Sequence, residues 1–196
     1  MFPDGIVYIG GIAIYLHAAN YEATRIFAEF THDADFYISM ADMSDLRDIE
    51  DVTANRRLNK HQLIKSGFDF DIYTEHHAAL IVPYDAVVAH SVKFGNLRVA
   101  GLEHLFVLKM EAYRDRRHSA KGRKDARDLF RIAAVAHESA HNFKPDLASP
   151  YLGNEHAELL GTVGRSPEAM ALASGNAKTA KQLRIYFGHI SAPLAS

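Results

Sequence analysis

Two aspartates, Asp33 and Asp35, stand one residue apart at the start of the run Phe36-Tyr37-Ile38. Such an apolar run predicts a β-strand, and side chains two residues apart on a strand point to the same side. Two carboxylates this close repel each other unless a cation compensates them. Hard divalent metals such as Mg²⁺ use one or two carboxylates together with substrate phosphates. The motif is therefore either a metal-binding pair or two solvated aspartates in a loop.

A pair of glycines, Gly10-Gly11, separates a predicted strand over residues 6–9 from a predicted helix over about 12–28. Glycine lets the backbone approach a phosphate closely, and the amino end of a helix favours negative charge. The pair thus indicates a phosphate-binding turn, with an ordinary strand-to-helix turn as the alternative.

A second pair of carboxylates, Asp69 and Asp71, lies in the segment Phe68–Tyr73, where apolar and polar residues alternate. On a strand this alternation puts the two aspartates on one face and the large apolar side chains on the other. The carboxylates then line a cleft, or they belong to the ordinary solvent face of a half-buried strand.

One lysine, Lys109, falls within the apolar stripe of a helix predicted over about residues 102–116. A lysine at such a position needs a partner, or its stem must carry the charge to the edge of the stripe. It therefore either reaches toward an anionic site or simply extends to solvent.

The remaining elements complete an α+β or α/β pattern. We expect a charged helix from an N-cap at Ser44 to about Lys65, a short strand over residues 79–82 and a hairpin turning at Gly95-Asn96. A helix over about 124–136 follows, and two or three short helices are expected after Pro145. The predicted organisation is a sheet domain over residues 1–100 and a C-terminal helical region over 101–196 packed on it.

The composition favours a globular protein without disulfides or membrane-spanning segments. The chain has 196 residues, of which 48% are hydrophobic, enough for a well-cored globular domain. It has no cysteine, which excludes disulfides and thiolate metal sites and fits a reducing cytosol. No stretch approaches the roughly 20 apolar residues that cross a bilayer, so we expect a cytoplasmic protein without a membrane partner. A net charge of −2 gives no global signature of nucleic-acid binding.

The string His137-Glu138-Ser139-Ala140-His141 matches the H-E-x-x-H pattern of zinc proteases. It lies at the end of a predicted helix and has no obvious third ligand, so a frayed helix end is the favoured interpretation. A third His, Asp or Glu converging on both histidines would restore the zinc hypothesis.

The order of these motifs resembles the DNA polymerase β-type nucleotidyltransferase superfamily, in which a Gly-Gly or Gly-Ser turn precedes an acidic pair and a third acid. The segment over residues 99–133 is similar to the C-terminal helices of bacterial minimal nucleotidyltransferases, including abortive-infection toxin relatives and their toxin–antitoxin cousins. Its matching positions are Glu103, Leu105, Lys109, Ala112, Arg114 or Arg116, Lys124, Asp125 and Asp128. The resemblance covers about residues 6–136 and implies a nucleotidyltransferase fold, a small mixed sheet flanked by helices.

The resemblance also implies a role for each matching residue. Gly10, Gly11 and Thr31 belong to the nucleotide-binding part, and Lys109 either lies near the triphosphate or helps to hold the architecture of the site. Asp33 and Asp35 bind two Mg²⁺ ions, and Asp71 is the third acid, with Asp69 in reserve. Two features depart from the family: Glu29 stands where relatives carry an arginine, and the spacing from Gly11 to Asp33 is long.

The activity implied is Mg²⁺-dependent transfer of a nucleotide from an NTP such as ATP to an acceptor hydroxyl, in a bacterial toxin–antitoxin or phage-defence system. The acceptor is tRNA or another RNA, or a cognate toxin or antitoxin protein. A basic segment that could contact a polyanion comprises Arg114, Arg116, Arg117, Lys121, Arg123 and Lys124. Two alternatives are an enzyme that modifies a small molecule such as an antibiotic, and an inactive member that only binds a partner.

Overall fold

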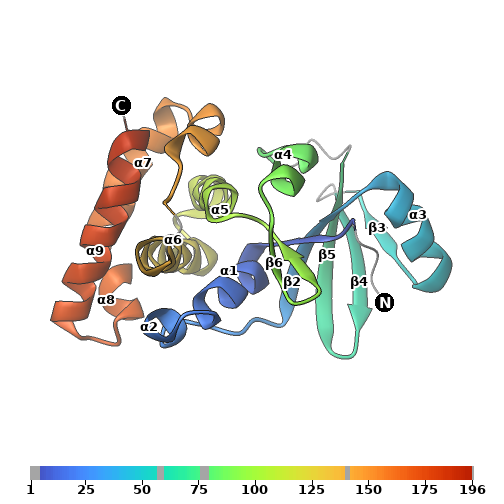
Figure 1. Cartoon of the computed structure of the whole chain (residues 1–196), viewed down its shortest axis with the longest axis horizontal. Helices are drawn as coiled ribbons and strands as arrows, with labels where there is room; N and C mark the ends of the chain where they lie inside the picture. The colour runs from blue at the N-terminus through green and yellow to red at the C-terminus, as the bar shows by residue number, and fades with distance from the viewer. Residues whose placement is uncertain (1–4, 57–59, 76–79, 140–141, 196) are drawn as a thin grey trace. The chain divides into compact units, whose positions relative to one another are not determined.

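The computed structural model describes residues 5–56, 60–75, 80–139 and 142–195 (Figure 1). Within them the chain forms two compact units. The first comprises Met1–Tyr15 and Phe30–Gly101, and the second comprises Leu16–Glu29 and Leu102–Ser196. The first contains a mixed sheet and the second is helical, so the chain is an α/β protein.

The first unit is built on a seven-stranded sheet with the order β3-β4-β5-β2-β1-β7-β6. The strands are β1 (Val7–Ile9), β2 (Asp33–Ile38), β3 (Thr53–Asn55), β4 (Lys60–Lys65), β5 (Phe68–Thr74), β6 (Val92–Phe94) and β7 (Leu97–Val99). β2 pairs with β5, and β1 with β7, in parallel, whereas the other neighbours are antiparallel. The β6–β7 hairpin confirms the predicted turn at Gly95-Asn96.

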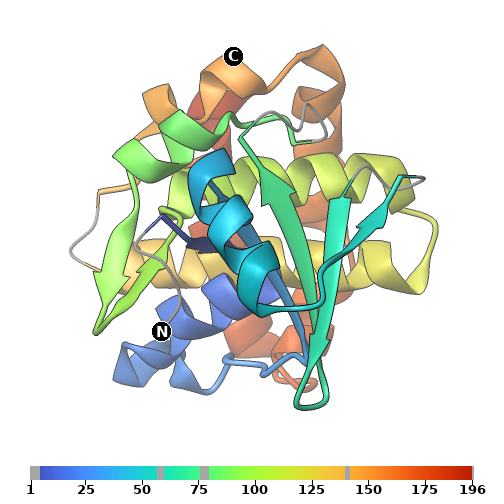
Figure 2. The same ribbon diagram turned by 90° about the vertical axis from the view of Figure 1, so that its right-hand side faces the viewer.

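One face of this sheet carries an apolar core. Helix α3 (Met40–Ile49) follows β2 and lies across the strands in Figure 2. The core cluster consists of Ile6, Phe36, Ile38, Met43, Leu46, Leu63 and Ile72. The helix α4 (Tyr84–Ala89) belongs to the same unit, where the Tyr84 hydroxyl donates to the Gly5 carbonyl oxygen at 2.8 Å.

The helix expected over residues 44–65 is wrong in both its start and its length. Ser39, not Ser44, is the N-cap, and its Oγ accepts from the Asp42 amide at 3.0 Å. α3 ends at Ile49, after which β3 and β4 pair with each other and β4 pairs with β5. This long-range pairing overrides the local helical pattern of the charged segment.

Two other elements of the structure differ from those expected from the sequence. The helix expected over residues 12–28 is divided into α1 (Gly10–Ala19) and α2 (Glu22–Arg25), and Thr24 Oγ1 donates to the Ala18 carbonyl oxygen at 2.8 Å across the break. The strand expected over residues 79–82 is wrong for residues 80–82, which form bends, and Ala79 lies outside the described residues.

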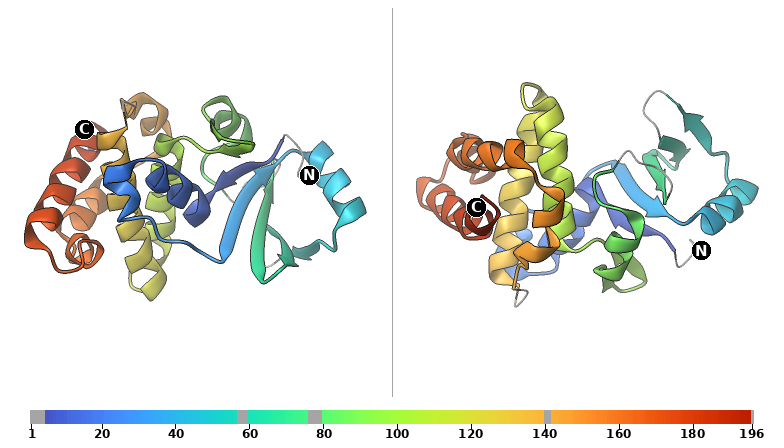
Figure 3. Two further views of the ribbon diagram at one scale, coloured as in Figure 1. Left: turned by 60° about the horizontal axis from the view of Figure 1, so that its bottom comes forward. Right: turned by 90° about the horizontal axis from the view of Figure 1, so that it is seen from above.

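The second unit is built around α5 (Leu102–Arg116) and α6 (Ala120–Glu138), which pack together. The tail adds α7 (Asn154–Arg165), α8 (Glu168–Leu172) and α9 (Ala177–Ser191), with 3-10 turns η1 (Pro145–Leu147), η2 (Ser149–Tyr151) and η3 (Ala192–Leu194). α9 lies beside α6 in both views of Figure 3, and the rings of Phe130 and Phe187 are 5.2 Å apart there. Two or three short helices were expected in this tail, but α7 and α9 have 12 and 15 residues. No helix in the described part of the chain has the length and apolar character needed to span a membrane.

Candidate functional site

Four carboxylates lie on one face of two adjacent strands. In the parallel register of β2 and β5, Asp33 is opposite Asp69 and Asp35 is opposite Asp71. Residues opposite each other in a parallel pair point to the same side, and so do residues two apart on one strand. The intervening apolar residues point to the core beneath α3. The two D-x-D motifs, separate in the sequence, therefore form one acidic face.

The Gly-Gly turn lies against this acidic face. Gly10 begins α1 with a φ of +64°, and a Cβ at this position would lie 2.1 Å from Asp35 Oδ2. A Cβ on Gly11 would lie 3.1 Å from Thr31 Cγ2. Only glycine at position 10 satisfies both the backbone conformation and the close approach of the carboxylate. The amino end of α1 also favours the negative charge of Asp35, which gives this aspartate a structural role beside any role in binding.

Thr31 positions the first aspartate. It is buried, with 8% of its surface exposed, and its Oγ1 accepts from the Asp33 amide at 3.2 Å. This hydrogen bond fixes the backbone where β2 begins. The sequence prediction placed Thr31 among the nucleotide-binding residues, and the contact adds a reason for a hydroxyl here.

Asp71 is held by neighbours on β4. Lys60 Nζ donates to Asp71 Oδ2, and Gln62 Nε2 donates to Oδ1 at 3.1 Å. Gln62 Oε1 in turn accepts from Asn55 Nδ2 at 2.9 Å, so a chain of side chains runs across β3, β4 and β5. Lys60 and Gln62 were not predicted as site residues, because the local pattern of the charged segment predicts a helix there. Their spacing of two residues, with Leu63 buried on the other face, is the signal that a strand assignment would have used.

Asp33 and Asp69, which lie opposite each other at the start of β2 and β5, have no comparable side-chain partners among the described residues. Asp33 and Asp69 are exposed, and neither side chain has a hydrogen-bond or ion-pair partner among residues 5–56, 60–75, 80–139 and 142–195. Asp69, the reserve choice for the third acid, is thus available to bind a ligand or a metal ion, whereas both oxygens of Asp71 already accept hydrogen bonds.

Asp33 and Asp35 fit a hard divalent cation. They are two carboxylates on one face beside a glycine turn, and Mg²⁺ is commonly bound by one or two carboxylates plus substrate phosphates. No group of three His, Cys, Asp or Glu side chains in the described part of the chain is arranged to hold a metal by itself. Asp71 fits as a further ligand only if it gives up its bond to Lys60.

Lys109 lies within a buried ion network of the helical unit. Its Nζ is 3.3 Å from Asp125 Oδ1 and 2.7 Å from Asp128 Oδ2, and its side chain is 12% exposed. Arg116 binds Asp125 through two nitrogens, at 2.7 and 2.9 Å, and Arg131 binds Asp128. Asp125 and Asp128 are therefore structural partners of Lys109, and a contact between Lys109 and a triphosphate stays a prediction.

Burial and charge oppose each other at Asp128. Burial by itself raises the pKa of this carboxyl group, but the neighbouring Lys109 and Arg131 together lower the pKa below its usual value. The carboxylate is thus kept ionised, which fits a fixed anchor for two cations.

The glutamate that departs from the family pattern belongs to the same network. Glu29 pairs with Arg131, and Arg131 Nε also donates to the Phe27 carbonyl oxygen at 2.7 Å. An arginine at position 29 would face Arg131 with a like charge, which explains a glutamate here.

The zinc-protease pattern receives no support from the described residues. The His137 ring is stacked on Tyr186, with centroids 3.8 Å apart and an interplanar angle of 19°. His141 lies outside the described residues, and no third ligand converges on His137 among the residues that are described.

Two solved structures are similar to this chain over most of its length. A solved structure, "putative nucleotidyltransferase from H. pylori", matches 97% of this chain and 88% of its own with a TM-score of 0.51 and 17% identity. The JHP933 protein from Helicobacter pylori matches 97% of this chain and 85% of its own, with a TM-score of 0.48 and 17% identity. No family model and no curated protein matches the chain.

The fold is therefore of the nucleotidyltransferase type, as the sequence resemblance implied. At 17% identity the first of these likenesses establishes the fold alone.

Proposed function

We propose that the chain is a nucleotidyltransferase that moves a nucleoside monophosphate from an NTP to an acceptor hydroxyl. The observation that carries this proposal is the register of β2 and β5, which gathers Asp33, Asp35, Asp69 and Asp71 on one face. The Gly10 backbone closely approaches one of these carboxylates, that of Asp35. An acidic face beside a glycine turn at a helix terminus suits a nucleotide that is bound together with divalent cations.

Each residue has a task in this proposal. The backbone of Gly10 and Gly11 binds the phosphates, and Asp33 and Asp35 hold Mg²⁺, two ions in the full form of the proposal. Bound Mg²⁺ supplies positive charge that neutralises the phosphoryl oxygens. Asp71, or Asp69 beside it, orients the acceptor hydroxyl and accepts its proton. Lys109 contributes by keeping the helical unit rigid through Asp125 and Asp128.

The acceptor in the leading form of the proposal is tRNA or another RNA, or a partner protein of a bacterial toxin–antitoxin or phage-defence system. This part is supported by the resemblance of residues 99–133 and by the basic segment between Arg114 and Lys124. A small-molecule acceptor such as an antibiotic is the alternative within the same chemistry.

The test is calorimetric binding of each NTP with Mg²⁺ to the wild-type protein and to the double variant Asp33→Ala/Asp35→Ala. The proposal expects at least one NTP to bind the wild type and this binding to fall by about two orders of magnitude or more in the variant, because two charged ligands are lost. Labelled NTP would then identify the acceptor. Failure of every NTP to bind the wild type would reject the enzyme.

A matched control is the double variant Asp45→Ala/Asp48→Ala. Both aspartates are exposed on α3 in the same unit, so the variant loses the same charge without touching the acidic face. NTP binding should be unchanged in this protein. Equal losses in the two double variants would mean that overall charge, and not the acidic face, governs binding.

A second candidate function is a catalytically inactive nucleotidyltransferase fold that binds a partner protein. It is favoured by one observation: both oxygens of Asp71 are bound by Lys60 and Gln62. If no NTP binds, co-purification of a specific partner protein supports this function.

A further inference from the structure

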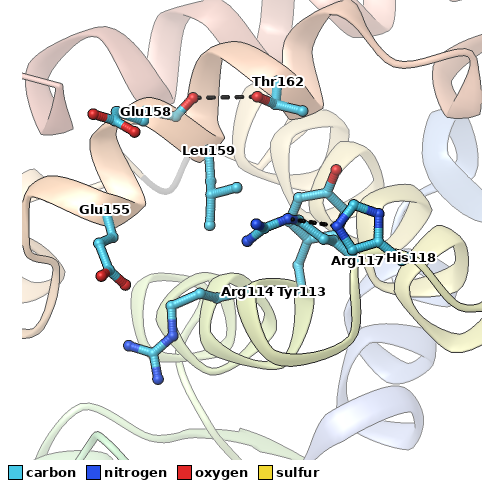
Figure 4. A pocket seen from close by; sticks show the side chains of 8 residues that line it. All are labelled: Tyr113, Arg114, Arg117, His118, Glu155, Glu158, Leu159 and Thr162. Carbon is cyan, nitrogen blue, oxygen red and sulfur yellow. Dashed lines mark hydrogen bonds between the residues drawn. The ribbon is translucent and has the colours of Figure 1, made fainter.

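A groove in the helical unit runs between the end of α5 and one side of α7 (Figure 4). It encloses about 770 Å³, within the size range of small-molecule sites. Tyr113 lines it from α5 and Arg117 from just after the end of α5, and the side chain of Leu159 points from α7 toward them. An adjoining cavity of about 450 Å³ shares Tyr113, Arg117, His118 and Thr162 with it, so the two form one continuous groove.

Three arginines that line the smaller cavity lack counter-ions, and Glu168 lines the same cavity with a single carboxylate. Arg117, Arg123 and Arg165 line it from three different helices or their ends. In the part of the chain that the structure describes, no carboxylate lies within 4.0 Å of any of these three guanidinium groups. Arg127 nearby differs, because its Nε lies 3.6 Å from Glu168 Oε2. Like charges that share a cavity are stabilised by an anion.

Two hydroxyl groups at the same place also lack partners. Tyr113 is only 7% exposed, and its hydroxyl makes no hydrogen bond to any of the described residues. Ser166 Oγ is buried and likewise has no partner among them. Burial raises the pKa of Tyr113, so the phenol stays protonated and available as a donor. The Ser166 hydroxyl is buried without a partner, which is destabilising, whereas the Tyr113 hydroxyl keeps some exposure to the cavity and is free to donate to the acceptor oxygens of a ligand.

The other end of the groove has two carboxylates and one arginine, so acidic side chains are in excess there. Glu155 and Glu158 of α7 line the larger cavity together with Arg114 of α5 (Figure 4), and Arg114 is already paired with Glu111 and Asp115. A continuous polyanion along the groove would meet these carboxylates and be repelled. A compact ligand avoids this conflict if its anionic end lies at the arginines and an amino or hydroxyl end lies at the glutamates.

We propose that this groove binds a small phosphate ester that carries amino or hydroxyl groups at its other end. Arg117, Arg123 and Arg165 bind the phosphate with the Tyr113 hydroxyl, and the Glu155 and Glu158 carboxylates accept hydrogen bonds from the other end. Guanidinium groups suit this ligand because they present paired donors to phosphate oxygens. The site shares no residue with the acidic face of the sheet and does not depend on the proposed transferase activity.

The test is calorimetric titration of the full chain with inorganic phosphate and with glucosamine 6-phosphate as the probe that carries both groups. Both titrations contain EDTA, so that no metal-dependent nucleotide site contributes. Glucosamine 6-phosphate should bind about tenfold more tightly than inorganic phosphate, because only it reaches the glutamates. No binding of glucosamine 6-phosphate by the wild type, or equal affinity for the two probes, overturns the proposal.

Single and double variants test which residues bind the phosphate and which bind the amino or hydroxyl end of the ligand. Arg117→Gln and Arg165→Gln should each weaken both probes about tenfold, and Tyr113→Phe about fivefold through loss of one hydroxyl. Glu155→Gln/Glu158→Gln should remove the advantage of glucosamine 6-phosphate without weakening inorganic phosphate. The matched control is Lys181→Gln, which removes one exposed charge from α9 outside the groove and should change neither affinity. Equal losses in Arg117→Gln and Lys181→Gln would overturn the site.

Discussion

Lys60 and Asp71 form a partly buried ion pair across β4 and β5, on the sheet face that carries Asp33 and Asp35. The Lys60 side chain is 12% exposed and that of Asp71 is 23% exposed. Gln62 binds the second oxygen of the same carboxylate at 3.1 Å. The ammonium group of Lys60 is therefore the present counter-ion of Asp71. A divalent cation at Asp71 has to compete with it.

Replacing Lys60 by an apolar residue should show whether its ammonium group competes with a divalent cation for Asp71. Lys60→Met leaves the Asp71 carboxylate without its cation, and we expect a loss of about 1–3 kcal/mol in the free energy of unfolding. Added Mn²⁺ should then raise the Tm of Lys60→Met by more than it raises the Tm of the wild type, because metal binding to the native state now replaces the missing charge. Thermal unfolding with and without Mn²⁺ measures both effects.

The control for this variant lies on the same strand. Lys65 of β4 pairs with Glu50 and is 50% exposed, so Lys65→Met should cost less than about 1 kcal/mol and leave the response to Mn²⁺ unchanged. A response of Lys60→Met to Mn²⁺ no larger than that of Lys65→Met would show that Lys60 does not compete with metal at Asp71.

The close approach of Asp35 to Gly10 predicts that alanine is more destabilising at position 10 than at Gly67. Gly10→Ala must place a Cβ 2.1 Å from Asp35 Oδ2 at a φ of +64°, and we expect it to lower the free energy of unfolding by about 3 kcal/mol. Gly67→Ala has a φ of +78° but open space around it, so only the backbone cost of about 1 kcal/mol applies. Urea unfolding of both variants tests the contrast, and equal losses would mean that Asp35 does not approach Gly10.

The acidic face shows what local sequence can and cannot predict. Alternation along Phe68–Tyr73 predicted that Asp69 and Asp71 share a face, because side-chain direction on a strand follows from spacing alone. The register that sets Asp71 beside Asp35 joins strands far apart in the chain, so only the family resemblance pointed to it. The partners of Asp71 were missed for the same reason, since β4 is stabilised by pairing with β5 rather than by its own residues.

The start of α3 is a local feature that was predicted five residues too late. Ser39 and Ser44 both have the residue type of an N-cap, but only Ser39 has an extended backbone, with ψ of 159°, and accepts from the Asp42 amide. Ser39→Ala should therefore cost about 1 kcal/mol. Ser44 is exposed inside the helix, where alanine has the higher helix propensity, so Ser44→Ala should be neutral or stabilise by a few tenths of a kcal/mol. Chemical denaturation compares them, and a larger loss in Ser44→Ala would place the cap at the later serine.

The network around Lys109 predicts a pH dependence with a definite sign. Asp128 is 2% exposed and is paired with Lys109 and Arg131, so Asp128→Asn should lower the free energy of unfolding by about 3 kcal/mol at neutral pH. The exposed Asp115, on α5, provides the control, because Asp115→Asn should change stability by no more than about 0.5 kcal/mol.

The direction of this pH dependence follows from the lowered pKa of Asp128 in the folded protein. A lowered folded pKa contributes stability that is fully present above the unfolded value, about 3.9, and is lost as the pH falls through the folded value. The difference in unfolding free energy between the wild type and Asp128→Asn should therefore stay constant from pH 7 down to about 5 and shrink only below about 4. Urea unfolding at a series of pH values measures it. A difference that already shrinks between pH 7 and 5 would mean that Asp128 titrates above its ordinary pKa, and that burial outweighs Lys109 and Arg131.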